Sequence, residues 1–299
     1  MDDVLVIGGS FAGLSAALQL GRARRRVTVL DTGLPRNRYA AHAHGMLGHD
    51  GKPPSEILKD GRAQLAQYPS IRLVNGRATR LGGAKDDFTV ATEAGEPLTA
   101  RRLILSYGIT DIFPEIDGFA ECWGRTVLHC PYCHGFEVGD RRLGVLYATP
   151  LSLHVMALLQ HWSDRLSLFT DGHDLPEGER EKLTGRGVTV IDGRVMALDH
   201  AEGELSAVRL AEGVAVPLDA LFAGPRQRPS ADIHEGLGLA MADGPLGQVI
   251  QVDDRFETSL AGVYAAGDVA NPMQSAHQAL SRGNMAGISC HQSLVFDQH

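Results

Sequence analysis

The sequence has few cysteines and no long hydrophobic run. It contains four cysteines in 299 residues, and no charged-then-apolar leader is seen at the N terminus, so a secreted disulfide framework is not expected. A reducing cytoplasmic compartment is the expected location. No apolar run approaches the roughly 20 residues that a membrane-spanning helix needs, so we expect no membrane contact.

Positive charge is also scarce. The formal net charge is -8, and the largest basic block is the stretch from Arg22 to Arg26. Nucleic-acid binding needs a basic surface that neutralises phosphates, so no nucleic-acid partner is expected. Small molecules and proteins remain as partners. The chain is 43% hydrophobic, which is enough to bury a full core, and its length predicts one large or two ordinary domains.

The N terminus has the pattern of a βαβ unit. Residues 4–7 form a continuous apolar run typical of a buried parallel strand, a glycine-rich turn and an expected helix follow, and residues 27–30 predict a second strand. In the turn, Gly8 permits the tight bend and Gly13 lets the helix pack on the strand, while Ser10 stands where a third glycine would let backbone approach a pyrophosphate. Asp31 ends the second strand, where an acid would bind a ribose hydroxyl. This pattern predicts a dinucleotide site; a glycine-rich turn alone is the alternative.

A distant turn supports this interpretation. Residues 262–268, GVYAAGD, join a short expected strand to a helix expected to begin near Ala276. Asp268 would then lie at a strand end beside a helix N terminus, where flavoenzymes place an aspartate on the ribityl chain. A turn-capping aspartate is the alternative, because aspartate favours that position.

Four ordered motifs resemble the low-molecular-weight thioredoxin reductase family of two-domain flavoproteins. They are GGSFAG at 8–13, LILSYG at 103–108 where the family usually has Ala-Thr-Gly, the Cys-x-x-Cys of 130–133, and YAAGDV at 264–269.

The resemblance implies an α/β fold of two Rossmann-like, doubly wound domains and a homodimer. A discontinuous FAD-binding domain would comprise residues 1–112 and 229–299. An inserted middle domain, residues 113–228, would carry the cysteine pair and would normally bind NADPH. The chain is expected to cross between the domains near Phe113 and Pro229.

The resemblance also implies which residues hold FAD. The implied set is Gly8, Ser10, Phe11, Ala12, Gly13, Asp31, Asn37, Arg38, His49, Gly108, Gly267, Asp268, His277 and Gln278. His42, His44 and His49 fall in a loop where the family's FAD domain approaches the isoalloxazine, and we interpret them as flavin-pocket or surface residues. His277 precedes Gln278 where the family usually has Arg-Gln; it is interpreted as a helix N-terminal residue, with a second acid-base group as the alternative.

The stretch HCPYCHGFE, residues 129–137, carries two cysteines three positions apart. Zinc would need two further ligands, no second Cys-x-x-Cys is present, and Cys122 and Cys290 are isolated, so no metal site is expected. A purely structural disulfide is not expected, because it would close too small a loop to remove much conformational entropy from the unfolded chain. Redox cycling remains, because the second thiolate of such a pair can displace a partner from a mixed disulfide. By the resemblance, Cys133 faces the flavin and Cys130 exchanges with substrate.

His134 follows the pair, where most thioredoxin reductases have Asp. Imidazole has an unperturbed pKa of about 6.5, so it can take a proton from an incoming thiol and return it later. The form Cys-x-x-Cys-His-Gly is similar to the branch containing dithiol oxidases that close disulfides in gliotoxin- and holomycin-type natural products. A histidine that only packs or caps beside the motif is the alternative.

The middle domain departs from the family where a second dinucleotide fingerprint belongs. Residues 143–146 predict a strand, and residues 151–162 predict the helix after it. The three diagnostic glycine positions fall on Tyr147, Thr149 and Ser152, with Pro150 between them. Side chains there would hold a pyrophosphate away from the backbone amides.

The next expected strand, residues 166–169, is followed by TDGHD at 170–174 in place of the family's basic cluster. The two acids would repel a 2′-phosphate. We therefore expect NADPH binding to be impaired, with NADH binding through Asp171 as a weak alternative.

The predicted function is that of an FAD-dependent thiol-disulfide oxidoreductase, in particular a dithiol oxidase that forms a disulfide in a small-molecule substrate, with oxygen as acceptor and hydrogen peroxide as product. Two alternatives stay open. One is a thioredoxin reductase-type enzyme that is reduced by NAD(P)H or ferredoxin and acts on a thioredoxin-like protein. The other is a non-enzymatic flavin redox sensor.

Overall fold

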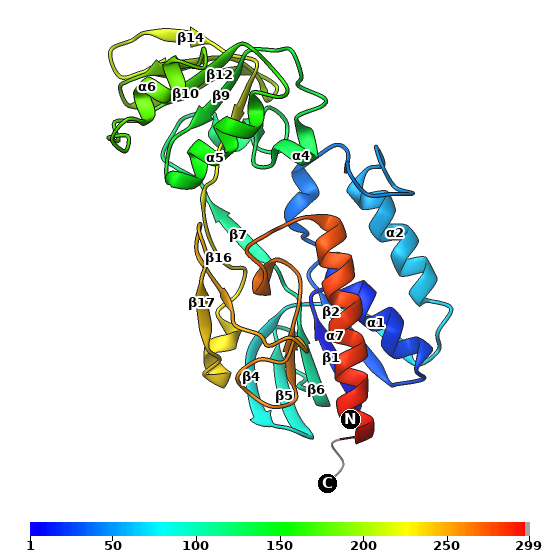
Figure 1. Cartoon of the computed structure of the whole chain (residues 1–299). Helices are drawn as coiled ribbons and strands as arrows, with labels where there is room; N and C mark the ends of the chain where they lie inside the picture. The colour runs from blue at the N-terminus through cyan, green and yellow to red at the C-terminus, as the bar shows by residue number, and fades with distance from the viewer. Residues whose placement is uncertain (297–299) are drawn as a thin grey trace. The chain divides into compact units, whose positions relative to one another are not determined.

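A computed structural model describes residues 1–296 of the chain, which divide into two compact units (Figure 1). Unit 1 comprises residues 1–38, 52–110 and the chain from Gln227 onward, and unit 2 comprises residues 39–51 and 111–226. The crossings expected near Phe113 and Pro229 lie close to these divisions, while the binding role of each domain stays a prediction. Nothing in the sequence predicted that residues 39–51 group with unit 2.

Unit 1 is built on a seven-stranded sheet in the order β3-β2-β1-β6-β5-β4, with β19 also paired to β6. Strands β1, β2, β3, β6 and β19 run parallel, and β4 and β5 add an antiparallel edge. The sheet strands are β1 (Asp2–Ile7), β2 (Val27–Asp31), β3 (Ile71–Asn75), β4 (Ala78–Ala84), β5 (Asp87–Thr92), β6 (Leu98–Leu105) and β19 (Val263–Ala265).

The other elements of this part of the chain are helical or short. The helices are α1 (Phe11–Arg22), α2 (Pro54–Leu65) and α7 (Ala276–Phe296), with 3-10 turns η1 (Arg36–Tyr39), η2 (Ile233–Leu237) and η3 (Asp268–Ala270). Strands β17 (Met241–Asp243) and β18 (Gln248–Ile250) pair with each other. Strands β7 (Ile109–Ile112) and β16 (Arg226–Pro229) also pair, and the chain passes from one unit to the other within each of them.

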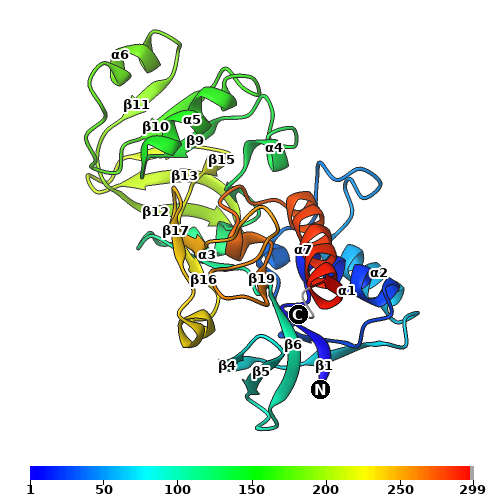
Figure 2. The same cartoon turned by 60° about the horizontal axis from the view of Figure 1, so that its bottom comes forward.

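Small residues let α1 and α7 pack closely, and the two helices lie side by side in both views (Figures 1 and 2). A Cβ at Gly283 would lie 2.7 Å from the carbonyl carbon of Ala12, and closer still to its oxygen. A Cβ at Gly287 would lie 2.7 Å from the carbonyl oxygen of Ala16. The hydroxyl of Ser15 donates to the carbonyl of Leu280 at 2.8 Å. The last helix therefore sits directly on the first turns of α1.

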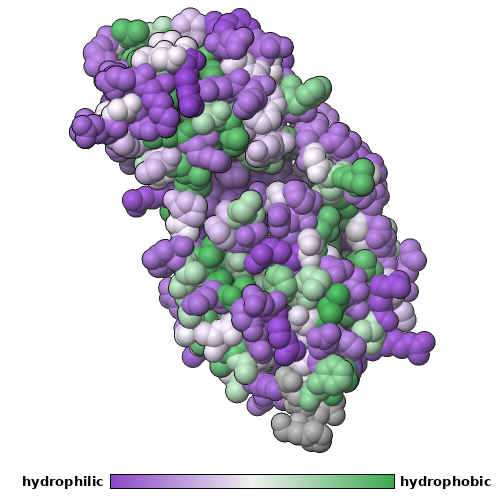
Figure 3. Space-filling model, in the orientation of Figure 1, coloured by the Kyte–Doolittle hydropathy of each residue, from purple (hydrophilic) through white to green (hydrophobic). Residues whose placement is uncertain are grey.

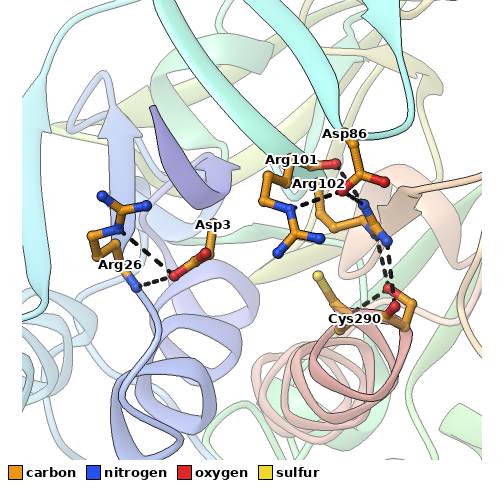
Figure 4. Close-up of polar contacts among 7 residues, drawn as sticks. Asp3, Arg26, Asp86, Arg101, Arg102 and Cys290 are labelled. Atoms are coloured by element: carbon orange, nitrogen blue, oxygen red, sulfur yellow. Dashed lines mark hydrogen bonds and ion pairs between the residues drawn. The ribbon is translucent and has the colours of Figure 1, made fainter. Parts of the chain in front are cut away.

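A buried arginine ties β6 to the far end of α7 (Figure 4). Arg102 is fully buried, and its guanidinium donates to the hydroxyl of Ser293 at 3.0 Å, to the carbonyl of Ser293 at 3.3 Å and to Asp86 at 2.8 Å. These bonds satisfy a charge that would be costly to bury alone. Cys290, one turn earlier, is a free thiol whose pKa is raised by complete burial, as suits a packing residue.

Unit 2 contains a five-stranded parallel sheet in the order β11-β10-β9-β15-β8 and a three-stranded antiparallel sheet, β12-β13-β14. Its strands are β8 (Val127–Leu128), β9 (Leu143–Leu146), β10 (Leu166–Phe169), β11 (Thr189–Ile191), β12 (Val195–Ala201), β13 (Glu204–Leu210), β14 (Ala215–Pro217) and β15 (Ala220–Phe222). Its helices are α3 (Phe119–Cys122), α4 (Pro131–His134), α5 (Pro150–Leu159) and α6 (Glu179–Thr184).

The predicted α/β class with two doubly wound domains is confirmed, because each unit has a set of parallel strands joined by strand-helix-strand crossings. The helix predicted over residues 151–162 ends earlier, at Leu159. The carbonyl of Trp162 accepts a hydrogen bond from the amide of Asp140 at 2.8 Å, so its backbone is bonded to a neighbouring loop.

In residues 1–296, no helix combines the length and apolar character that crossing a bilayer would require. On the face drawn in Figure 3, hydrophobic residues are scattered among hydrophilic ones.

Candidate active site

The glycine-rich turn between β1 and α1 is tight and leaves the start of α1 open. Gly8 has a φ of 103°, and a Cβ at Gly13 would lie 2.9 Å from the carbonyl carbon of Gly8, so neither position accepts a side chain. Ser10 stands before the helix without a side-chain cap bond, and no acidic residue lies in the first turn. An uncapped helix start and the positive end of the helix dipole suit a pyrophosphate at this position.

Asp31 holds this turn from the end of β2. Its Oδ1 accepts the amide of Gly9 at 2.9 Å, and its Oδ2 accepts Nη2 of Arg62 at 2.8 Å. Arg62, on α2, also reaches the carbonyl of Gly9 at 3.3 Å. Sequence reasoning missed Arg62, because no motif marks it and only tertiary packing brings α2 to the turn. Both oxygens of Asp31 are thus used within the protein, and its bond to a ribose stays a prediction.

The distant GVYAAGD turn meets the same helix start. A Cβ at Gly267, whose φ is 78°, would lie 2.9 Å from the Cβ of Ala12. The next residue, Asp268, pairs with Arg36 at 3.4 Å, and both side chains are largely buried. Arg36 also donates to Gln274 at 2.6 Å. Two segments far apart in the sequence therefore converge at the start of α1.

The remaining flavin candidates lie in several places. Gly108 has a φ of 71° and open space around it. His277 is exposed at the start of α7, where its Nδ1 and the amide of Gln278 both lie 3.3 Å from the hydroxyl of Ser275. Asn37 and Arg38 lie in η1, and His49 groups with unit 2.

The open helix start and the two converging turns fit the adenosine diphosphate and ribityl parts of FAD. Contact of each of these candidate residues with the cofactor stays a prediction.

The cysteine pair begins a short helix on unit 2. Cys130 is the N-cap of α4, Cys133 lies within it, and the two form a disulfide with a Cα–Cα distance of 5.3 Å. Both cysteines are partly exposed. Their neighbours Tyr132 and Phe136 are 72% and 88% exposed, so an apolar surface borders the disulfide. The pair is placed to exchange with a thiol from solution.

His134 closes α4 directly after the second cysteine. Burial lowers the pKa of its imidazole, the charge of Glu137 raises that pKa, and His44 lowers it further. The net effect is a pKa below the ordinary value, so the ring is neutral at pH 7 and can accept a proton.

The middle-domain turn is closed by its own side chains. The hydroxyl of Ser152 accepts the amides of Ala148 at 3.1 Å and Thr149 at 3.5 Å, and Pro150 begins the helix without an amide hydrogen. Tyr147 is buried. The amides of Ala148 and Thr149 are therefore already bonded here and Pro150 supplies none, whereas α1 begins with Phe11, which carries an amide hydrogen.

One of the two acids after β10 has a structural partner. Asp171, with a φ of 52°, accepts the amide of Val195 at 2.8 Å, which uses one oxygen of the carboxylate considered above for NADH. The ring of His173 stands edge-on to Tyr147, with ring centroids 6.2 Å apart. These contacts order the turn where the family's basic cluster would bind a 2′-phosphate.

Within residues 1–296, no group of three or more His, Cys, Asp and Glu side chains is arranged to hold a metal ion. Cys122 and Cys290 are both buried and free.

The chain resembles known proteins over nearly its whole length. The model of the pyridine nucleotide-disulphide oxidoreductase family matches residues 2–283. Thioredoxin reductase sirT of Leptosphaeria maculans is 33% identical, with 95% of this chain and 92% of that protein covered. Thioredoxin reductase tcpT of Claviceps purpurea is 33% identical, with 99% and 95% covered.

Solved structures agree with the sequence matches. An oxidoreductase from Agrobacterium tumefaciens is 43% identical with a TM-score of 0.94, and 99% of each chain is covered. The crystal structure of HlmI is 39% identical with a TM-score of 0.91, covering 98% of this chain and 92% of that one. With the disulfide pair and the dinucleotide turn in place, the chain belongs to the pyridine nucleotide-disulphide oxidoreductase family and is a thioredoxin reductase-like oxidoreductase that acts on sulfur groups.

Proposed function

We propose that the protein is an FAD-dependent dithiol oxidase that closes a disulfide in a small-molecule substrate and passes the electrons to oxygen, yielding hydrogen peroxide. The observation that carries the proposal is the contrast between two helix starts. Before α1, the Gly9 amide is bonded to Asp31 but Ser10 makes no cap bond, whereas before α5 the amides of both Ala148 and Thr149 are bonded to Ser152 and the helix begins with Pro150. One dinucleotide site is open and the equivalent turn of the middle domain is occupied by protein atoms, which favours a flavoprotein that draws its electrons from thiols instead of NADPH.

The residues of the chain account for the thiol chemistry. A substrate thiolate attacks the sulfur of Cys130, forming a mixed disulfide and releasing the thiolate of Cys133. The second substrate thiolate then attacks the substrate sulfur of the mixed disulfide and releases Cys130. The substrate loses two electrons and two protons, and the enzyme disulfide becomes a dithiol. His134, neutral at pH 7, accepts the proton of the incoming thiol and returns it to a departing cysteine thiolate.

FAD, when bound, would supply a two-electron acceptor for the Cys130–Cys133 dithiol, with oxygen as the final acceptor. Unit 1 would bind its pyrophosphate at residues 8–13 and its ribityl chain near Asp268, with Gly267 allowing the close approach of the two turns. The protein should therefore purify yellow. A colourless protein that takes up no flavin on reconstitution would contradict the proposal at its first step.

The identity of the electron donor distinguishes the proposed dithiol oxidase from the alternative functions. A small dithiol added under air should give continuous oxygen consumption and peroxide, and the Cys130→Ser variant should give neither. Added without oxygen, the dithiol should bleach the flavin and air should restore it. NADPH should not bleach the flavin on the timescale of turnover, because two amides of the middle-domain turn are bonded to Ser152 and Pro150 supplies none for the pyrophosphate.

Each alternative function predicts a different experimental result. Stopped-flow bleaching by NADPH within seconds, followed by reduction of a thioredoxin-like protein, would return the chain to the reductase class. Reduction by ferredoxin with transfer to a disulfide protein would do the same. A flavin that is reduced by dithiols once but shows no turnover under air would indicate a redox sensor.

A further inference from the structure

The loop of residues 39–51 brings a second histidine to the redox helix. This loop groups with unit 2, and within it the ring of His44 stands edge-on to the ring of His134, with centroids 6.4 Å apart and an interplanar angle of 80°. The His44 side chain is only 21% exposed. It is therefore packed into the site rather than displayed on its surface.

Two carboxylates hold His44 from the side. Its Nδ1 lies 3.3 Å from Oε1 of Glu137, which follows α4, and 3.7 Å from Oδ1 of Asp50. Asp50 also accepts the amide of Gly45 at 2.8 Å, which fixes the loop around the histidine. The ring of His42, at a centroid distance of 6.2 Å, is the other titratable group beside His44.

We propose that His44 is a positioning residue for His134: anchored by Glu137 and Asp50, it fixes the His134 ring beside the cysteine pair and keeps that ring from taking up a proton before the thiol arrives. The inference rests on the proposed function, because it concerns the group that accepts the proton of the substrate thiol.

The electrostatics of the cluster predict the sign of each substitution. Burial is the main cause of the lowered pKa of His134, His44 adds to the lowering, and Glu137 opposes it. Removing the His44 ring takes away the group whose charge lowers the pKa of His134 and leaves the charge of Glu137 without this partner. Both changes raise the pKa of His134. Removing the charge of Glu137 acts in the opposite direction.

The experiment measures the pKa of His134 directly. Histidine labelled with 13C at Cε1 is followed by NMR across pH in the oxidised protein, with the His134 signal assigned from its loss in His134→Ala. We expect the His134 pKa to rise in His44→Ala and to fall in Glu137→Gln. His42→Ala removes an exposed histidine from the same loop and is the matched control, in which the His134 pKa should not move.

The same variants are then assayed with a small dithiol. In His44→Ala the acid limb of the kcat/KM profile should move to higher pH together with the NMR value. The loss of ring positioning should lower kcat by roughly tenfold to a hundredfold. A lower kcat without a shift in the acid limb of the kcat/KM profile would indicate that His44 acts only in folding or packing.

Three results would overturn the inference. They are an unchanged His134 pKa in His44→Ala, an equal shift in His42→Ala, and shifts of the same sign in His44→Ala and Glu137→Gln. Since Glu137 is partly exposed, its variant tests the cluster even if His44→Ala folds poorly. Absence of dithiol turnover in the parent protein would reject the proposed function alone, because the NMR titration judges the histidine pair without it.

Discussion

Replacing Gly283 with alanine tests whether close packing of α7 on α1 holds the candidate flavin turn. A new Cβ would lie 2.7 Å from the carbonyl carbon of Ala12, and closer to its oxygen, whereas ordinary contacts begin at 3.4 Å. The obstacle is helix backbone and cannot rotate away, so the two helices must separate. Overpacking of this kind costs typically about 1–3 kcal/mol, and a backbone clash belongs at the upper end.

The gain in helix propensity from glycine to alanine is about 1 kcal/mol and offsets part of that cost. The free energy of unfolding should therefore fall by about 2 kcal/mol. At about 2–4 °C per kcal/mol for a chain of this class, the Tm should fall by roughly 4–8 °C. Because Ala12 lies in the predicted FAD turn, the flavin content of the purified protein should fall as well.

Two matched variants make the comparison sharp. At Gly61, on α2, a Cβ would meet only the end of the Leu14 side chain at 3.3 Å, so Gly61→Ala should be neutral or stabilising. Gly287→Ala, with its Cβ 2.7 Å from the carbonyl oxygen of Ala16, should fall between the two. Thermal unfolding followed by circular dichroism, with flavin absorbance measured in parallel, gives both quantities. A Gly283→Ala protein that melts at or above the parent temperature would refute the reasoning.

Three further predictions follow from the redox helix and from unit 2. Cys130→Ser and Cys133→Ser should each abolish turnover and keep the flavin. A long-wavelength absorbance band should appear only in Cys130→Ser, where the Cys133 thiolate remains to interact with the flavin. The band in Cys133→Ser instead would show that Cys130 is the cysteine that faces the flavin. His134→Ala should lower turnover roughly a hundredfold, and His134→Asp should move the pH-rate profile downward because a carboxylate titrates near about 4; an alanine variant as active as the parent would leave His134 a packing residue. The hydrogen bond from Arg142, at 2.9 Å, lowers the pKa of Asp219 to about 2, so its stabilising contribution is complete above about pH 4 and is lost as pH falls towards 2. Urea unfolding of Asp219→Asn should lack this acid-dependent component, and curves parallel to the parent between pH 4 and 2 would contradict it.

Local patterns predicted the parts of the fold that depend on near neighbours in the chain. The apolar run at 4–7, the glycine turn after it and the strand at 27–30 were correctly placed, because a buried parallel strand and a tight turn each have a strong residue preference. The GVYAAGD turn was also placed correctly before the helix at Ala276. The same patterns could not show that Arg62 holds Asp31, since arginine on a helix surface carries no signal of its partner.

The middle-domain turn shows both what can be read from the sequence and what cannot. Missing glycines at Tyr147, Thr149 and Ser152 predicted an impaired dinucleotide site. Only the structure shows that the hydroxyl of Ser152 bonds the amides of Ala148 and Thr149. A serine at this position could equally have pointed to solvent, because its rotamer depends on the surrounding packing.

The sequence by itself determined the family, the two-unit α/β architecture and the chemistry of the pair at 130–133, because each is carried by residue types at short, fixed spacings. Only the tertiary structure decided which distant groups meet. It placed residues 39–51 with unit 2, brought His44 close to Glu137 and to the ring of His134, and packed Gly283 against Ala12. The physical reason is that these contacts join segments many residues apart. Their geometry depends on the packing of whole helices and loops, which a local residue pattern does not encode.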